Sequence, residues 1–184
     1  ERMRVTQAQG QGLGQVPLWR HQLAAATLAH FAAPSLHPWV TEAAAGRALL
    51  TLDIGALSSA QGIALHAHES SQGWHLSGRV NAVALAEQSQ AAVVLVSIEG
   101  HPRLALIELA STAIKHVPGR LTHGEGIADL HIESLTIAHE QLLPAAALSW
   151  LEPRATAALA SLQLGVSAEQ IRRTVAYVTD RRQV

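Results

Sequence analysis

The segment from Pro153 to Val184 constrains the fold most, because it shows helical spacing over an unusual length. Its apolar residues recur at intervals of three, four or five, which places them along one face of a helix. These residues are Leu159, Leu162, Val166, Ile171, Val175 and Val178. Pro153 suits the first turn, where its missing N–H is no loss. We therefore expect a helix longer than a small domain is wide, with the rest of the chain packed beside it.

Two further features of this segment bear on packing. Gly165 has no turn partner nearby, so it predicts a close backbone approach at mid-helix and not a break. The helical pattern still continues at Val184, with no glycine cap or proline after it. From this we expect a fragment, or a protein that has lost its remaining helices.

The N-terminal part of the chain predicts two helices. Residues 1–15 are rich in Gln and Gly without periodicity and are expected to form a loop or a frayed end. An alanine-rich pattern predicts a helix over 16–31. A shorter helix should run from residue 36 or 37 to 45, with Gly46 as its left-handed cap. The candidate core positions of the first helix are Leu18, Leu23, Leu28 and Phe31.

From Ala48 the period changes to two, which is typical of strands with one buried face. Alternation is clearest over 63–67 and 74–77, and the turn residues between them predict a hairpin. Further strand candidates are 91–98, 104–109 and 130–137, whereas 121–127 is irregular. Six or so short strands without intervening helices predict an antiparallel sandwich or barrel. The expected fold class is α+β, an antiparallel β-barrel or sandwich flanked by helices.

The composition excludes several classes of function. The net charge is −1, so no broad field attracts nucleic acid or an anionic membrane. The absence of cysteine excludes disulfides, thiol catalysis and cysteine-ligated metal sites. No apolar run approaches the ~20 residues that a membrane-spanning helix needs, and no signal peptide is recognisable, so the default expectation is a cytoplasmic protein.

Several motifs resemble the acyl-CoA dehydrogenase family. Leu164-Gly165, then Thr174-Val175-Ala176-Tyr177, then Arg181-Arg182-Gln183-Val184 is similar to the first long helix of that family's C-terminal domain, with Val184 in place of a phenylalanine. Weaker similarities lie in Val16-Pro17-Leu18, Trp39–Arg47, Gly73–Gly78 and Ala128–Leu143. The resemblance implies the end of an N-terminal helical domain (1–47), a middle β-barrel domain (48–143) and the start of a C-terminal helical domain (144–184).

The resemblance also implies where a flavin would lie. Family members hold FAD through a Thr-Glu-Pro motif and a Trp-Ile-Thr motif, which fall here on Gly55, Ala56 and Leu57 and on Ala82, Val83 and Ala84. These side chains offer no hydrogen bond to a flavin and no aromatic wall. The catalytic glutamate of the family usually lies beyond Val184, and in some members near Ala155. Glu152 is about a turn away behind Pro153, so we assign no catalytic residue.

One family site is retained in the sequence. Arg181 and Gln183 match an arginine and a glutamine that, in related enzymes, contact the FAD held by the neighbouring subunit around its pyrophosphate and adenosine. A guanidinium suits pyrophosphate, because its planar fork donates two hydrogen bonds at once. The alternative is that Arg181, Arg182 and the pair Arg172-Arg173 are only solvated helix charges.

The resemblance therefore implies a subunit of an FAD-dependent acyl-CoA dehydrogenase, which oxidises an acyl-CoA thioester to its α,β-enoyl form. FAD would be shared with a homologous partner subunit, as in heteromeric members of the family, some of which act on steroid side chains. Two alternatives stay open: a self-sufficient enzyme with a divergent flavin pocket, and a flavin-free scaffold or binding protein.

Other candidate motifs have simpler interpretations. His66 and His68 project to the same side of one strand and could begin a metal site, but we interpret them as surface residues and assign no metal. Ser58-Ser59 could retain a cofactor or acyl-CoA contact, although a loop serine pair is usually a turn. The glycine-rich segment 10–14 follows no strand, so it is not a phosphate loop.

Overall fold

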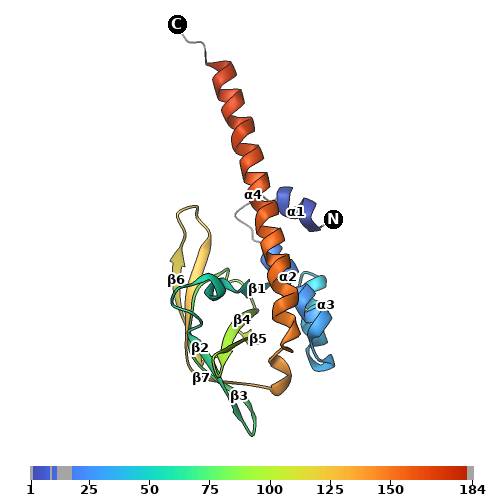
Figure 1. Ribbon diagram of the computed structural model, residues 1–184, viewed down its shortest axis with the longest axis vertical. Coiled ribbons are helices and arrows are strands. Elements are labelled where there is room, and N and C mark those ends of the chain that lie inside the picture. The colour runs from blue at the N-terminus through green and yellow to red at the C-terminus, as the bar shows by residue number, and fades with distance from the viewer. Residues whose placement is uncertain (1, 9, 12–17, 182–184) are drawn as a thin grey trace.

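The computed structural model describes residues 2–8, 10–11 and 18–181, and places the helices on one side of a curled sheet (Figure 1). The α-helices are α1 (Arg2–Ala8), α2 (Leu18–Phe31), α3 (His37–Ala44) and α4 (Ala146–Asp180). The strands are β1 (Leu50–Asp53), β2 (Leu65–Ser70), β3 (Gly73–Ala84), β4 (Ala91–Ile98), β5 (His101–Glu108), β6 (Ile114–Arg120) and β7 (Gly126–Ile137). The α+β fold class is confirmed, as are the predicted hairpin of β2 and β3 and the left-handed Gly46 after α3.

The sheet is a half-barrel of seven strands, in the order β1-β4-β2-β3-β7-β6 with β5 paired to β4. The pairs β2–β3, β3–β7, β6–β7 and β4–β5 are antiparallel, as predicted. The pairs β1–β4 and β2–β4 are parallel, so the expectation of a purely antiparallel sheet is wrong. β1 and β2 pair with opposite ends of the same edge of β4. Alternation within a strand cannot reveal such a pairing.

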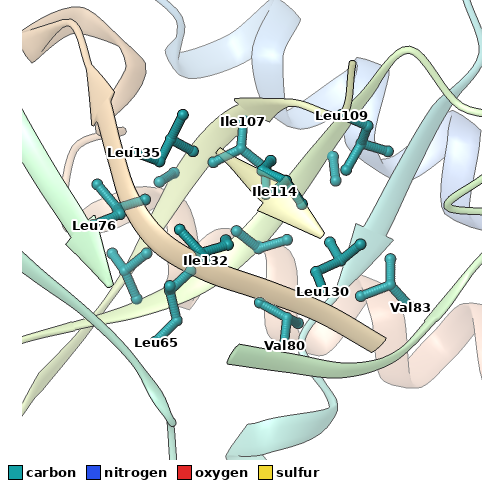
Figure 2. Packing of buried hydrophobic residues seen from close by; sticks show 14 of the residues in the cluster. Leu65, Leu76, Val80, Val83, Ile107, Leu109, Ile114, Leu130, Ile132 and Leu135 are labelled. Carbon is teal, nitrogen blue, oxygen red and sulfur yellow. The ribbon is translucent and has the colours of Figure 1, made fainter. Parts of the chain in front are cut away.

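Strand β4 separates two hydrophobic cores. One set of its side chains, Ala92, Val94 and Val96, joins a cluster inside the half-barrel, where Leu65, Leu76, Val80, Leu130 and Ile132 converge (Figure 2). The opposite set, Ala91, Val93 and Leu95, packs against the helices. A strand buried on both faces reads as a continuous apolar run, which is the pattern of residues 91–96.

Helix α2 closes the free edge of the sheet at β1. The Leu50 N–H donates to His21 Nδ1 at 3.1 Å, and Arg20 donates to the Leu52 carbonyl oxygen at 2.8 Å. Both backbone groups lie on the strand edge that faces away from β4. Side chains of α2 thus satisfy an edge that would otherwise be open to another strand, and they fix α2 against the end of β1.

Helix α4 begins seven residues before Pro153, at Ala146, so the expectation that Pro153 lies in the first turn is wrong. The turns before the proline pack Ala147 and Leu151 into the helix-side core, where both are fully buried. An interior proline costs about 3 kcal/mol, and burial of this helix face offsets that cost. Because the helix continues unbroken, Pro153 does not separate Glu152 from it.

The second half of α4 extends away from the sheet, and α1 lies beside its middle (Figure 1). A side chain at Gly165 would collide with the Gln7 carbonyl oxygen, and one at Gly10 would collide with the Leu162 carbonyl oxygen. The predicted close approach at Gly165 is therefore confirmed. The expectation of a loop over residues 1–15 is wrong for 2–8, which become a helix by packing on α4.

A further difference concerns a single strand. Strand β6 was not expected, because Pro118 and Gly119 interrupt any alternation. It forms at the end of the strand order by pairing with β7.

Within the described residues, no helix combines the length and apolarity needed to cross a membrane.

Candidate functional site

Three charged side chains lie around the carboxyl end of β1, next to α2 and α4: Arg20, Asp53 and Glu152. Strand β1 ends at Asp53, and the 3₁₀ turn Gly55–Ser58 follows at once. Asp53 is only 8 % exposed. Burial raises the pKa of its carboxyl, while the charge of Arg20 and a backbone hydrogen bond from Gly55 lower it in part. The chain therefore holds a largely buried acidic group at the end of a strand, where such a group costs stability unless it has a use.

Asp53 lines a cavity of about 300 Å³ between α2, the 3₁₀ turn and α4. Its charged lining comes from Arg20, Asp53 and Glu152, and its apolar lining includes Trp19 and Leu159. The hydroxyls of Ser58 and Thr156 also line it, and each donates to a backbone carbonyl oxygen. The Arg20 guanidinium carbon lies 4.6 Å from the centroid of the Trp19 ring. Ala155, the position at which some family members carry their base, also lines this cavity.

A second cavity of about 270 Å³ shares Asp53 and Gly55 with the first. It lies on the sheet side of the turn, and its polar lining includes Ser59, Arg79 and Asn81. Of the serine pair, Ser58 donates to the Gly55 carbonyl oxygen at 3.2 Å, and Ser59 Oγ accepts from the Gln61 N–H at 3.2 Å. Both serines thus make turn contacts, as the simpler interpretation had it. Asp53 stands at the junction of the two cavities.

The two segments that match flavin-binding motifs do not fit a flavin ring. Gly55, Ala56 and Leu57 form the 3₁₀ turn and carry no polar side chain. Val83 and Ala84 are buried in the sheet, with 0 % and 1 % exposure, so neither forms the wall of an open site.

The one exposed position of the second motif is also engaged. Ala82 has a left-handed φ of 53°, and its N–H donates to Asp129 Oδ1 at 2.7 Å. The backbone N–H of this exposed residue therefore already has a partner. We derive no chemical step through a flavin bound by these residues.

Arg181 lies just beyond the last turn of α4, at the end far from the sheet (Figure 1). It is exposed, and its guanidinium carbon lies 5.6 Å from the Tyr177 ring centroid. Gln183, the other residue expected to contact a cofactor, lies outside the described residues, as does Arg182. Arg172 and Arg173 both bind Glu169, which lowers the pKa of that carboxyl to about 2. Those two arginines are thus paired helix charges, as their simpler interpretation had it.

The histidines form no centre in the part of the chain that the structure describes. His66 and His68 are exposed on β2, and His68 lies opposite His75 of β3. No group of three or more His, Asp or Glu side chains that could hold a metal ion exists among the described residues.

This arrangement of a half-barrel packed against a helical layer, with a long helix leaving it, is the fold of the acyl-CoA dehydrogenases. No family model matches the sequence, and no curated protein matches it significantly, so the likeness is one of structure. The resemblance seen in the sequence is confirmed at the level of the fold.

Three solved structures illustrate the likeness. The chain superimposes on one chain of the ChsE4-ChsE5 complex from Mycobacterium tuberculosis with a TM-score of 0.89 and 22 % identity. It matches a variant of the Tcur3481-Tcur3483 steroid ACAD with a TM-score of 0.88 and 23 % identity. It matches a glutaryl-coenzyme A dehydrogenase in complex with glutaryl-CoA with a TM-score of 0.83 and 15 % identity. Each match covers 99 % of this chain and 50 % of the other, so the chain spans half the length of these proteins.

Proposed function

We propose that this chain is part of a subunit of an FAD-dependent acyl-CoA dehydrogenase and that it helps to bind FAD held mainly by a homologous partner. One observation carries the proposal: the positions that would face the chain's own flavin are apolar or already engaged, whereas Arg181 is exposed at the far end of α4. A guanidinium in that place can donate two hydrogen bonds to the pyrophosphate of a cofactor on another subunit. Gln183, two residues on, would act beside it.

The surface of α4 supports a partner. Beyond Gly165 its large side chains Ile171, Val175 and Val178 are 59–66 % exposed. An apolar row of this kind at helical spacing is costly in water and is typical of a face that another element covers. The two heteromeric structures that the chain matches, ChsE4-ChsE5 and Tcur3481-Tcur3483, are complexes of this fold. From the same family likeness, we infer that the substrate is an acyl-CoA and that the protein is cytoplasmic.

The Arg181→Ala variant tests the proposal. The full-length chain is co-produced with its homologous partner, and the FAD content of the purified assembly is measured by its flavin absorbance. We expect one FAD per pair of subunits in the unaltered assembly. Arg181→Ala should weaken FAD binding by roughly tenfold or more, since hydrogen bonds to charged groups contribute about 1.5–3 kcal/mol.

Arg172→Ala is the matched control. It removes an arginine from the same helix, but one that is already paired with Glu169, so the FAD content should not change. Unchanged FAD content in Arg181→Ala would favour the flavin-free scaffold instead. A yellow, active assembly of this chain alone would favour a self-sufficient enzyme with a divergent flavin pocket.

A further inference from the structure

The cavity between α2, the 3₁₀ turn and α4 contains two opposite charges that do not pair. Arg20 and Asp53 both line it, and their charges interact. Their charged atoms nevertheless do not approach within the 4.0 Å of an ion pair in the described part of the chain. Each group has one fixed backbone partner: Arg20 Nη1 donates to the Leu52 carbonyl oxygen, and Asp53 accepts from Gly55.

Both groups retain hydrogen-bonding capacity after these contacts. A guanidinium has five N–H donors and a carboxylate has about four acceptor sites. Arg20 Nε is buried without a hydrogen-bond partner, which shows that the guanidinium is not saturated by the protein. Asp53 is more than nine-tenths buried, so bulk water does not supply its missing partners in the way it does for a surface carboxylate.

The remaining lining of the cavity sets the shape and polarity of a ligand. Trp19, Leu57 and Leu159 provide apolar surface beside the two charges. The volume of about 300 Å³ lies at the lower end of the range found for small-molecule sites. A group that fits between Arg20 and Asp53 must accept a hydrogen bond from the first and donate one to the second.

We propose that this cavity binds a small amphipathic molecule whose hydroxyl or primary amide group bridges Arg20 and Asp53 while its apolar part packs against Trp19, Leu57 and Leu159. An ionised carboxylate is rejected, because Asp53 repels it at close range and Glu152 adds to the repulsion. A neutral ester is a poor substitute, because it accepts a hydrogen bond from Arg20 but leaves Asp53 without a donor. The inference concerns this chain's own cavity and does not rest on a flavin shared with a partner.

The test is a titration of the full chain with three probes of equal chain length: heptanamide, methyl heptanoate and heptanoate. Binding is followed by ¹H–¹⁵N correlation spectra, using the Trp19 indole N–H and the Gly55 amide as local reporters. Heptanamide should bind, and methyl heptanoate should bind roughly tenfold or more weakly, because a buried polar group left unpaired costs about 1–3 kcal/mol. Heptanoate should bind more weakly still.

Asp53→Asn supplies the decisive comparison. It removes the negative charge and keeps the shape, so heptanoate, now attracted by Arg20, should gain roughly tenfold or more in affinity. Glu152→Gln is the matched control: it removes the same charge from an exposed position on the same cavity, where solvent screening limits the gain to about threefold or less.

Several outcomes would overturn the proposal. Equal binding of heptanamide and methyl heptanoate would show that no bridging group is recognised. Shifts absent from Trp19 and Gly55 would place any binding elsewhere. An identical effect of Asp53→Asn and Glu152→Gln on heptanoate would mean that the overall charge, and not the bridge, decides affinity. The comparison of probes on the unaltered chain needs no variant, so it holds even if a variant fails to fold.

Discussion

At the scale of single residues, Asp53 is the position where local stability and site chemistry oppose each other. Its carboxyl is buried at the end of β1 with a charged partner that it does not touch. A sequence chosen only for stability would place a neutral residue there, because a buried carboxylate gains little when its partner is imperfectly placed. Function is the usual reason for keeping such a group.

Asp53→Asn should therefore stabilise the protein at neutral pH. Burial raises the folded-state pKa of Asp53 above its ordinary value of 3.8, so the folded state holds this proton more tightly than the unfolded state does. The contribution of Asp53 to stability is complete below that value and is lost as pH rises through the folded pKa. The gain from Asp53→Asn should accordingly be present at about pH 7 and vanish below about pH 4.

The measurement is urea unfolding of both proteins across this pH range. The exposed Glu152→Gln should show little change in the free energy of unfolding at either end, because an exposed carboxyl has no burial cost to relieve. A gain for Asp53→Asn that persists unchanged below about pH 4 would contradict the assignment of the effect to the charge of Asp53.

At the scale of elements, the two halves of α4 differ in how far tertiary packing stabilises them. The first half is held by burial of Ala147, Leu151 and Ala155 in the helix-side core, where α4 contacts β5 and α2. The second half touches the described residues mainly through α1 at Gly165. Every described residue from Ile171 to Arg181 is exposed. Packing therefore explains the start of the helix better than its end.

Pro153→Ala should stabilise the chain. Proline cannot donate to the Ser149 carbonyl oxygen four residues earlier, and an interior proline costs about 3 kcal/mol. Alanine restores the donor, although it also makes the unfolded chain more flexible, so we expect a net gain of about 1–3 kcal/mol in the free energy of unfolding. Thr156→Ala, an exposed change three residues on, should alter it by less than about 1 kcal/mol. Equal effects of the two variants would show that the proline costs the helix nothing.

Gly165→Val should detach α1 from α4. A side chain at this position would meet the Gln7 carbonyl oxygen and approach Gly10 Cα, both of which are backbone and cannot rotate away. Overpacking of this kind costs about 1–3 kcal/mol, and limited proteolysis should then cut within 1–17 faster than in the unaltered chain. Gln170→Val, at an exposed position of the same helix, should leave the cleavage rate unchanged. If Gly165→Val were cleaved no faster, α1 would not depend on this crossing.

At the scale of the whole molecule, the chain is a half-barrel and a helical layer joined through β4, and the far half of α4 extends from them as an arm (Figure 1). The exposed residues of this arm include the apolar Ile171, Val175 and Val178. The two cores give the body its stability. The far half of α4 contributes nothing to either core from Ile171 onward. It is the part of the molecule that an assembly would complete.

Hydrogen exchange should separate these two parts. In the chain alone, amides over 171–180 should exchange at least tenfold faster than those over 147–155, because only local helix bonds protect them. If the proposed assembly forms, the outer amides should become protected in it while the inner ones stay unchanged. Equal and slow exchange of both segments in the chain alone would mean that the arm is stable without a partner.

The sequence by itself determined the elements whose cause is local. Period-two alternation, the turn at 70–73, the alanine-rich helix at 18–31 and the glycine after α3 follow from backbone preferences that act over a few residues. The long helix and the close approach at Gly165 were predictable for the same reason. Motif matching also identified the fold. The roles that it implies for Arg181 and Gln183 stay predictions.

Only the tertiary structure decided the features that depend on distant segments. The helical state of residues 2–8, the start of α4 before its proline, the parallel pairing of β1 with β4 and strand β6 all arise from packing partners far along the chain. The cavity that joins Arg20, Asp53 and Glu152 is of the same kind, since Arg20 and Glu152 lie 132 positions apart in the sequence. Alternation and propensity report each residue's near neighbours, whereas burial and the pairing of charges depend on which segments the folded chain brings together.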